Sequence, residues 1–152
     1  MKSTVATFNS GIALIPKDIR EDVQSSLQKT IVVWGKGASP ELRNGVLKAL
    51  SNRGWVTNVR VSAKLGITVT AMKGKYALSV QTGNMARYYS DVMKQQYLFA
   101  TKKIVGGLLV VPQAGPSRKM GSNIANFGRV SRELRAFERS VFTYPLLVWG
   151  VY

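Results

Sequence analysis

The sequence is poor in the residues on which most enzyme active sites depend. It contains no cysteine and no histidine, and only 7 of its 152 residues are aspartate or glutamate. The absence of cysteine excludes disulfide bonds and thiolate zinc sites. The absence of histidine excludes Ser-His and Cys-His nucleophile pairs, imidazole metal ligands and an imidazole base near neutral pH. Acid–base chemistry would therefore have to use a carboxylate, a lysine or a tyrosine.

The chain also lacks a long apolar run. No stretch approaches the roughly 20 apolar residues of a membrane-spanning helix, and residues 1–10 are too polar for a signal peptide. We therefore expect no membrane partner and an intracellular protein of the cytoplasm, the nucleoid or a virion. A length of 152 residues suits one domain with a sizeable core, so we expect a single domain over residues 1–152.

Basic residues greatly outnumber acidic ones. The 22 lysines and arginines against 7 acids give a net charge of +15. This excess favours a polyanionic partner, nucleic acid before an anionic membrane surface, although a merely cationic soluble surface is the alternative. All the acids fall on predicted helices, where the helix dipole and nearby basic residues explain them. They are Asp18, Glu21, Asp22, Glu41, Asp91, Glu133 and Glu138.

Hydrophobic periodicity predicts an α/β protein. Helical spacing occurs in residues 16–29, 40–52, 84–101 and 123–139, and Ser39 is expected to cap the second of these helices. Strand patterns occur in residues 55–61, 67–72, 76–82, 104–111 and 146–151. Residues 30–34 fit a helix end or, because they are β-branched, a short strand, and residues 113–122 are predicted to be a flexible loop. The strand, helix and strand after residue 76 imply a right-handed crossover, so we expect a mixed central β-sheet flanked by helices.

Residues 67–101 form the centre of this prediction. Apolar residues alternate up to a Lys-Gly-Lys turn at 73–75, the run resumes, and Gly83-Asn84 then ends the strand and starts a long helix. The end of the second strand thus carries Gln81, Thr82, Asn84 and Arg87, polar side chains able to reach a ligand. On the helix, the spacing places Met85, Tyr89, Val92, Met93 and Phe99 in the core and leaves Tyr88 or Tyr97 for a partner surface.

The hexapeptide Ser79-Val80-Gln81-Thr82-Gly83-Asn84 carries a family resemblance. With Thr70 nine residues earlier, and a helix and a valine-rich strand after it, this segment resembles the metal-site hairpin of the PD-(D/E)XK restriction endonucleases, especially the BglII and BamHI group. That family has Asp, about nine residues, and Glu-x-(Gln, Glu or Lys), and some members continue Thr-Gly-Asn. The resemblance, strongest over residues 55–112, implies a restriction-endonuclease-like fold and a DNA partner.

The chain departs from this pattern at the metal-binding acids. Thr70, or Thr68 if the register slips, and Ser79 stand where the family places its two carboxylates, and only Gln81 is retained. Mg²⁺ needs hard oxygen ligands, usually paired carboxylates, which a neutral hydroxyl does not replace. We therefore expect no cofactor, and Mg²⁺ only if the chain is a working nuclease.

Polar and basic side chains near this hairpin are the candidate contacts to nucleic acid. Arg60 projects from a strand and Lys73 and Lys75 flank the hairpin turn, whereas Arg118 and Lys119 lie in the loop after a buried strand. The alternative for Arg60 is an edge or salt-bridged arginine, and the alternative for Arg118 and Lys119 is a solvated loop tip. The predicted set consists of Arg60, Lys73, Lys75, Thr82, Asn84, Arg87, Arg118 and Lys119, beside the degenerate positions Thr70, Ser79 and Gln81.

Three functions fit the sequence. In the first, a protein with a nuclease fold binds duplex DNA without cutting it, as a homodimer or as a subunit of a larger complex. In the second, it is a Mg²⁺-dependent nuclease whose acids were replaced or recruited from elsewhere. In the third, it is a structural component of packaged nucleic acid or of a ribonucleoprotein. Few aromatic residues fall in the candidate binding regions, which favours duplex binding over single-strand stacking.

Overall fold

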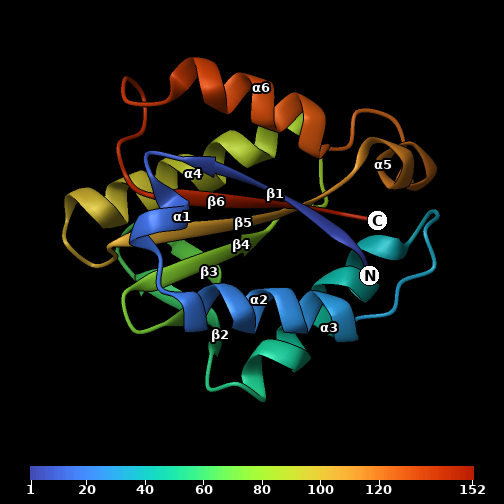
Figure 1. Ribbon diagram of the computed structural model, residues 1–152, viewed down its shortest axis with the longest axis horizontal. Coiled ribbons are helices and arrows are strands. Elements are labelled where there is room, and N and C mark those ends of the chain that lie inside the picture. Colours follow the sequence, from blue (N-terminus) through green and yellow to red (C-terminus); the bar gives the residue numbers. More distant parts are fainter.

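A six-stranded mixed sheet forms the centre of the computed structural model, which describes residues 1–152 (Figure 1). Across the sheet the strand order is β1-β6-β5-β4-β3-β2. Strand β5 runs parallel to β4 and to β6, and the other neighbours are antiparallel. The strands are β1 (Ser3–Phe8), β2 (Val56–Ser62), β3 (Ile67–Lys73), β4 (Tyr76–Val80), β5 (Gly106–Pro112) and β6 (Leu146–Val151). The predicted α/β class with a mixed central sheet is confirmed.

Helices cover both faces of the sheet (Figure 1). Helices α2 and α3 bury residues such as Leu27 and Leu42 against Leu78 and Leu108 on one face, and α4 and α6 form a second core on the other. The helices are α1 (Gly11–Leu14), α2 (Lys17–Lys29), α3 (Ala38–Ser51), α4 (Met85–Ala100), α5 (Ala114–Met120) and α6 (Phe127–Phe137). None of them is both long and apolar enough to cross a membrane. Strand β5 is buried along its whole length, as its continuous apolar run predicted.

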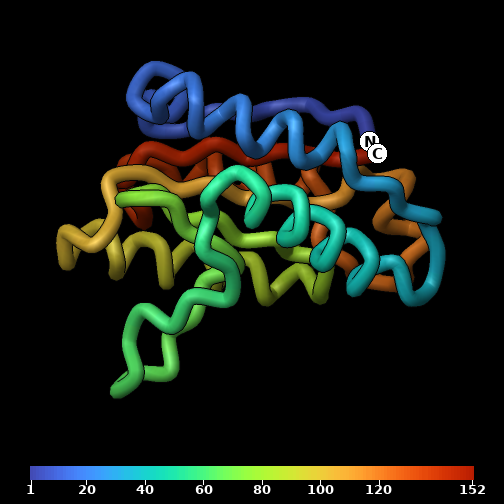
Figure 2. Tube along the Cα trace, turned by 90° about the horizontal axis from the view of Figure 1, so that it is seen from below, coloured from blue at the N-terminus to red at the C-terminus, as the bar shows by residue number.

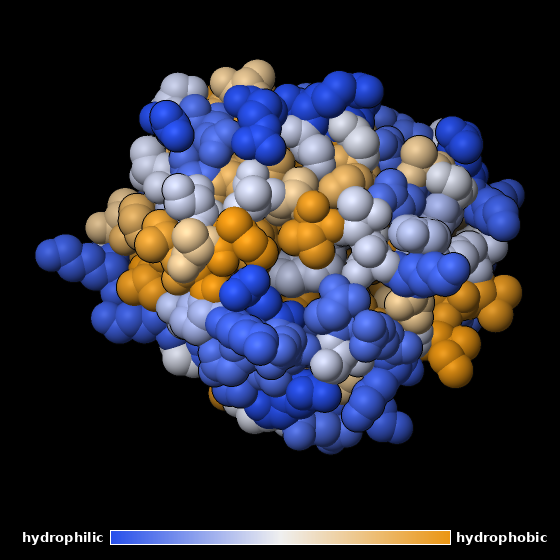
Figure 3. All heavy atoms as spheres, in the orientation of Figure 1, coloured by the Kyte–Doolittle hydropathy of each residue, from blue (hydrophilic) through white to orange (hydrophobic).

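The structure differs from the local predictions in four places. Strand β1 and helix α1 lie in the N-terminal residues, where no element was predicted, because an edge strand with one solvated face shows little apolar patterning. Residues 113–122 contain helix α5 instead of a loop. Residues 30–34 form no strand, and Ile31 and Val33 are 89% and 80% exposed. Figure 3 shows hydrophobic side chains, in orange, at the surface on the right, over the segment between α2 and α3. Ser39 does not cap α3. The N-cap residue is Gly37, with a φ of 91°, and the Ser39 hydroxyl donates to the Thr82 carbonyl instead.

Helix α4 buries Met85 and Val92 as predicted but differs from the prediction at other positions. Tyr88 is fully buried while Tyr89 and Met93 are exposed, so the predicted buried stripe was wrong at these positions. The polar residue Gln95 belongs to the buried stripe, where its Nε2 donates to Leu108 O at 3.1 Å and to Ser79 Oγ at 3.3 Å. A buried polar residue with hydrogen-bond partners is invisible to a hydrophobic pattern, which explains the error.

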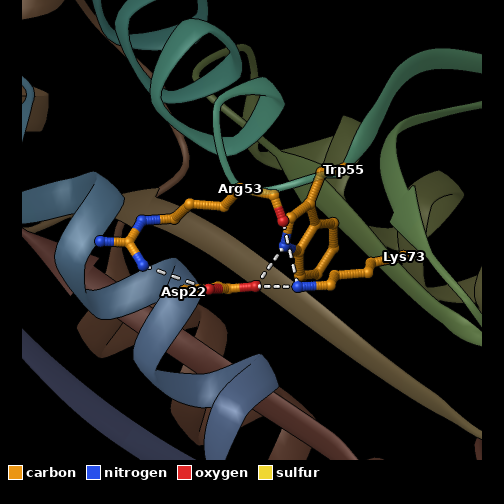
Figure 4. A network of polar contacts seen from close by, with 4 residues as sticks. All are labelled: Asp22, Arg53, Trp55 and Lys73. Carbon is orange, nitrogen blue, oxygen red and sulfur yellow. Dashed lines mark hydrogen bonds and ion pairs between the residues drawn. The ribbon is translucent and has the colours of Figure 1, made fainter.

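Asp22 is a buried acid, in contrast to the predicted surface role for all seven acids. Its carboxylate accepts hydrogen bonds from Lys73 Nζ at 2.7 Å, Trp55 Nε1 at 3.0 Å and Arg53 Nη1 at 3.2 Å (Figure 4). Burial acts to raise the pKa of Asp22, but the hydrogen bonds from Lys73, Trp55 and Arg53 outweigh it, so the pKa lies below its ordinary value. This network, the Asp22 network, joins α2 to the end of α3 and to the β3–β4 hairpin.

The β2–β3 hairpin projects from the body of the protein (Figure 2). Its turn consists of exposed residues, including Lys64 and Leu65. Arg60 lies on the same hairpin, is exposed, and donates from Nη2 to Ala63 O at 3.3 Å. Arg60 is therefore in a position accessible to a partner.

Candidate nucleic-acid interface

A polar cleft of about 460 Å³ opens between α3, the β3–β4 hairpin and the first turns of α4. We call it the hairpin cleft. Three of its side chains are cationic and only one is a carboxylate. Its polar lining consists of Ser39, Arg43, Asn58, Thr68, Thr70, Gln81, Thr82, Arg87, Asp91 and Lys94.

Thr70 lies on the wall of this cleft with a buried hydroxyl. The β3–β4 register ends at Ala71 and Leu78, and beyond it the Val80 N–H donates to Thr70 Oγ1 at 3.1 Å. Arg43 Nη1 donates to the same oxygen at 3.2 Å. The hydroxyl thus joins the two strands and positions an arginine.

Arg43 reaches the cleft from α3. Its Nη2 donates to Asn58 Oδ1 at 2.8 Å, so two neutral side chains hold the guanidinium. Asn58 has a φ of 53° within strand β2, a conformation that non-glycine residues adopt rarely and asparagine more easily than most. None of the ion pairs in the protein involves Arg43.

Gln81 binds the only carboxylate of the cleft. Its Nε2 donates to Asp91 Oδ2 at 2.6 Å, and its Oε1 accepts from the Gly83 N–H at 2.9 Å. Burial raises the pKa of Asp91, although the hydrogen bond from Gln81 and the charges of Lys94 and Arg43 oppose this effect. The Asp91 carboxylate is therefore a weaker acid than an exposed one.

Ser79 does not line the cleft. It is buried and its Oγ accepts from Gln95 Nε2, on the face of β4 that α4 covers. The structure thus places Thr70 and Gln81 around one cavity and leaves Ser79 outside its lining.

The remaining predicted residues are divided among several places. Thr82 and Arg87 line the hairpin cleft. Asn84 caps α4 by accepting from the Ala86 N–H at 2.9 Å. Lys73 belongs to the Asp22 network, and Lys75 is exposed at the hairpin turn.

Arg118 and Lys119 lie in a second cleft of about 560 Å³, formed by α5 and the segment before α6. Lys36 and Arg129 also line this basic cleft, which contains no carboxylate in its lining, although Arg129 pairs with Glu133 at 2.7 Å. A β-bridge between Asn84 and Ile124 connects the segments that border the two clefts.

Sequence reasoning did not identify Arg43, Asn58, Asp91 and Lys94 as site residues. Arg43 and Asn58 come from elements outside the central hairpin, and only the tertiary structure brings them to it. Asp91 and Lys94 were interpretable as parts of the polar face of a helix. Their spacing from Arg87, at positions 4 and 7 residues later on α4, was the one available signal.

The side chains present do not suit a divalent metal ion. No group of three or more histidine, cysteine or acidic residues is arranged to hold one. Asp91 is bound to Gln81, and three cations share the cleft. A hard cation needs carboxylate oxygens, usually more than one.

The mixed sheet, its two helical layers and the cleft at the hairpin define an α/β protein of the restriction-endonuclease-like type. The model of the family described as restriction endonuclease BglII/BglIII matches residues 5–151, so the chain belongs to this family, and the predicted resemblance is confirmed. No curated protein matches the chain.

Solved structures of the restriction endonuclease BglII share the fold. The structure of BglII complexed with a DNA 16-mer is 12% identical and superposes with a TM-score of 0.90, over 100% of this chain and 78% of that one. Free BglII is 14% identical with a TM-score of 0.78, over 100% of this chain and 80% of that one.

Proposed function

We propose that this protein binds duplex DNA through its sugar–phosphate backbone and does not hydrolyse it. The observation that carries the proposal is the set of side chains in the hairpin cleft, three cations and one carboxylate bound to an amide. Cations neutralise phosphates, whereas metal-dependent hydrolysis needs acids that hold the ion. Thr70 and Ser79 offer only hydroxyl groups where the family pattern has those acids.

Four further features support a DNA duplex as the ligand. The net charge of +15 favours a polyanion, and one of the similar structures is a BglII complex with DNA. The basic cleft adds Arg118 and Lys119 as phosphate contacts beside the Arg87 of the hairpin cleft. Neither cleft is lined by an aromatic side chain, and stacking on aromatic residues is the usual means of binding single strands.

An electrophoretic titration of duplex DNA, single-stranded DNA and RNA at two salt concentrations tests this proposal. We expect tightest binding to the duplex. Arg87→Ala and Arg118→Ala should each lower the salt dependence by about one unit, because each removes one phosphate contact. Arg132→Ala is the matched control, since Arg132 is an exposed helical arginine that lines neither cleft. If the salt dependence of Arg87→Ala and Arg118→Ala equals that of the wild type and of Arg132→Ala, neither Arg87 nor Arg118 is in the interface.

A second candidate function is Mg²⁺-dependent cleavage with a recruited ligand. Asp91 favours it, because this carboxylate lies in the hairpin cleft within hydrogen-bonding distance of Gln81. Incubation of supercoiled plasmid with Mg²⁺ distinguishes the two functions. Our proposal expects intact plasmid, whereas nicking that is lost in Asp91→Asn would establish the nuclease.

A structural role in a nucleic-acid particle is the remaining alternative. It predicts equal affinity for DNA and RNA in the same titration and copurification within a particle. We further propose that the DNA-binding form is a homodimer or part of a larger complex. Sedimentation of the protein with and without a short duplex tests the homodimer, and a monomer in both states would contradict it and leave only the larger complex.

A further inference from the structure

Arg43 is a fixed positive charge without an acidic partner. Helix α3 supplies it, and its guanidinium is held at 3.2 Å from Thr70 Oγ1 and at 2.8 Å from Asn58 Oδ1. A guanidinium group has five N–H donors, of which these two contacts use two. The remaining N–H donors of Arg43 are available to a ligand in the hairpin cleft, which this residue lines.

No acidic side chain forms an ion pair with this charge. Asp91 is the only acid that lines the cleft; its Oδ2 accepts from Gln81, and no ion pair forms between Asp91 and Arg43. Arg87 and Lys94 add two more positive charges. An anion entering here meets three cations and displaces no internal salt bridge of Arg43.

A divalent cation would meet the opposite situation. To bind Thr70 Oγ1 it would have to lie beside the guanidinium that already donates to this oxygen. Like charges at such a separation repel each other strongly in a partly buried site. The position of Arg43 therefore favours a phosphate and disfavours a metal ion at the same place.

We propose that Arg43 binds a phosphodiester oxygen of DNA directly, so that the affinity of the protein for duplex DNA does not depend on a divalent ion. This inference rests on the proposed DNA binding. Arg43 is well suited to the task because a guanidinium forms paired hydrogen bonds with two phosphate oxygens. Thr70 and Asn58 orient the group before DNA arrives, which reduces the conformational entropy lost on binding.

The first experiment uses the wild-type protein. Its dissociation constant for a short duplex is measured by fluorescence anisotropy in EDTA and in Ca²⁺ or Mg²⁺, at matched ionic strength. We expect values within about twofold of each other. An increase in affinity of tenfold or more on addition of either ion would overturn the inference while leaving DNA binding intact.

The second experiment uses variants of Arg43. Arg43→Ala should weaken duplex binding by about tenfold, the loss of one charge-assisted contact, and lower the salt slope by about one unit. Arg43→Lys keeps the charge and should keep the slope. Arg132→Ala is again the control, and thermal unfolding establishes that each variant is folded.

The outcomes separate the inference from the proposal beneath it. If the wild type binds no duplex, the proposed function fails. If the wild type binds but Arg43→Ala shows the same affinity and slope, only the role of Arg43 fails. If Arg43→Ala does not fold, Arg43→Gln, which also removes the charge but keeps an amide N–H donor, should lower the slope by about one unit, and an unchanged slope would overturn the role of Arg43.

Discussion

Replacing Asp22 with asparagine should destabilise the protein measurably. Removing one member of a buried ion pair costs about 3 to 5 kcal/mol when its partner stays buried and unpaired. In the Asp22 network the side chains of Lys73 and Arg53 are still 34% and 31% exposed, so water can solvate part of their released charge. The asparagine also retains an oxygen that can accept from Trp55 Nε1. We therefore expect the free energy of unfolding to fall by about 2 to 3 kcal/mol.

Thermal and urea unfolding of wild type and Asp22→Asn provide the measurement. For a domain of this size the expected loss corresponds to a decrease in Tm of about 4 to 12 °C. The pKa of Asp22 lies below its ordinary value of 3.8, so its contribution is complete above that value and is lost as the pH falls through the folded-state pKa. The difference between the two proteins should be constant from about pH 7 to pH 5 and should shrink below about pH 4.

Glu21→Gln is the matched control for this prediction. Glu21 is the preceding residue on α2, and its carboxylate forms an exposed pair with Lys17 at 3.6 Å. Exposed pairs of this kind contribute about 0 to 1 kcal/mol. Equal destabilisation by Asp22→Asn and Glu21→Gln, or a difference that grows as the pH falls, would refute the reasoning about the Asp22 network.

Three further predictions concern the hairpin and the sheet, and urea unfolding measures all of them. Thr70→Val should cost about 1 to 3 kcal/mol because a buried backbone N–H loses its acceptor, whereas Thr70→Ser should cost less than about 1 kcal/mol; equal losses would contradict this. Ser79→Glu should cost about 3 kcal/mol or more because the carboxylate would be buried against Gln95, and a stable variant would show that the site opens to water. Gly107→Ala should cost about 1 to 3 kcal/mol, since a Cβ there would overlap Gln95 Oε1, while Gly35→Ala, with open space around it, should have no effect; similar midpoints would be the contrary result.

The central elements of the fold were predictable because they are patterned over their whole length. Strand β5 is an uninterrupted apolar run, and α2 ends within a residue of its predicted limits. Strand β1 was not predictable in this way, because it is held at the sheet edge by backbone pairing with β6 rather than by an apolar pattern of its own. A local sequence pattern reveals which face of a strand is hydrophobic, but it does not reveal which strand pairs with it at the edge of the sheet.

The candidate site was predictable only where it is local. Gln81 and Thr82 directly follow β4 and Arg87 lies in the first turn of α4, and the structure brings all three to one cleft. Arg43 and Asn58 are 27 and 12 positions before Thr70, and no sequence pattern indicates which face of α3 or β2 meets the hairpin. Their contribution depends on packing between elements, which a single sequence does not encode in any local period.

The scarcity of acids and the excess of bases in this protein have a common physical consequence. In a metal-dependent site, carboxylates bind a divalent ion, and the positive charge of that ion neutralises the phosphate. Without those carboxylates the phosphate needs another positive partner, and Arg43, Arg87 and Lys94 offer it from the protein itself. Because Arg43 is held by neutral oxygens, binding DNA would break no internal ion pair of this residue. The set of side chains that makes the hairpin cleft unfavourable for a metal ion is therefore the set that would favour the phosphate backbone in the proposed function.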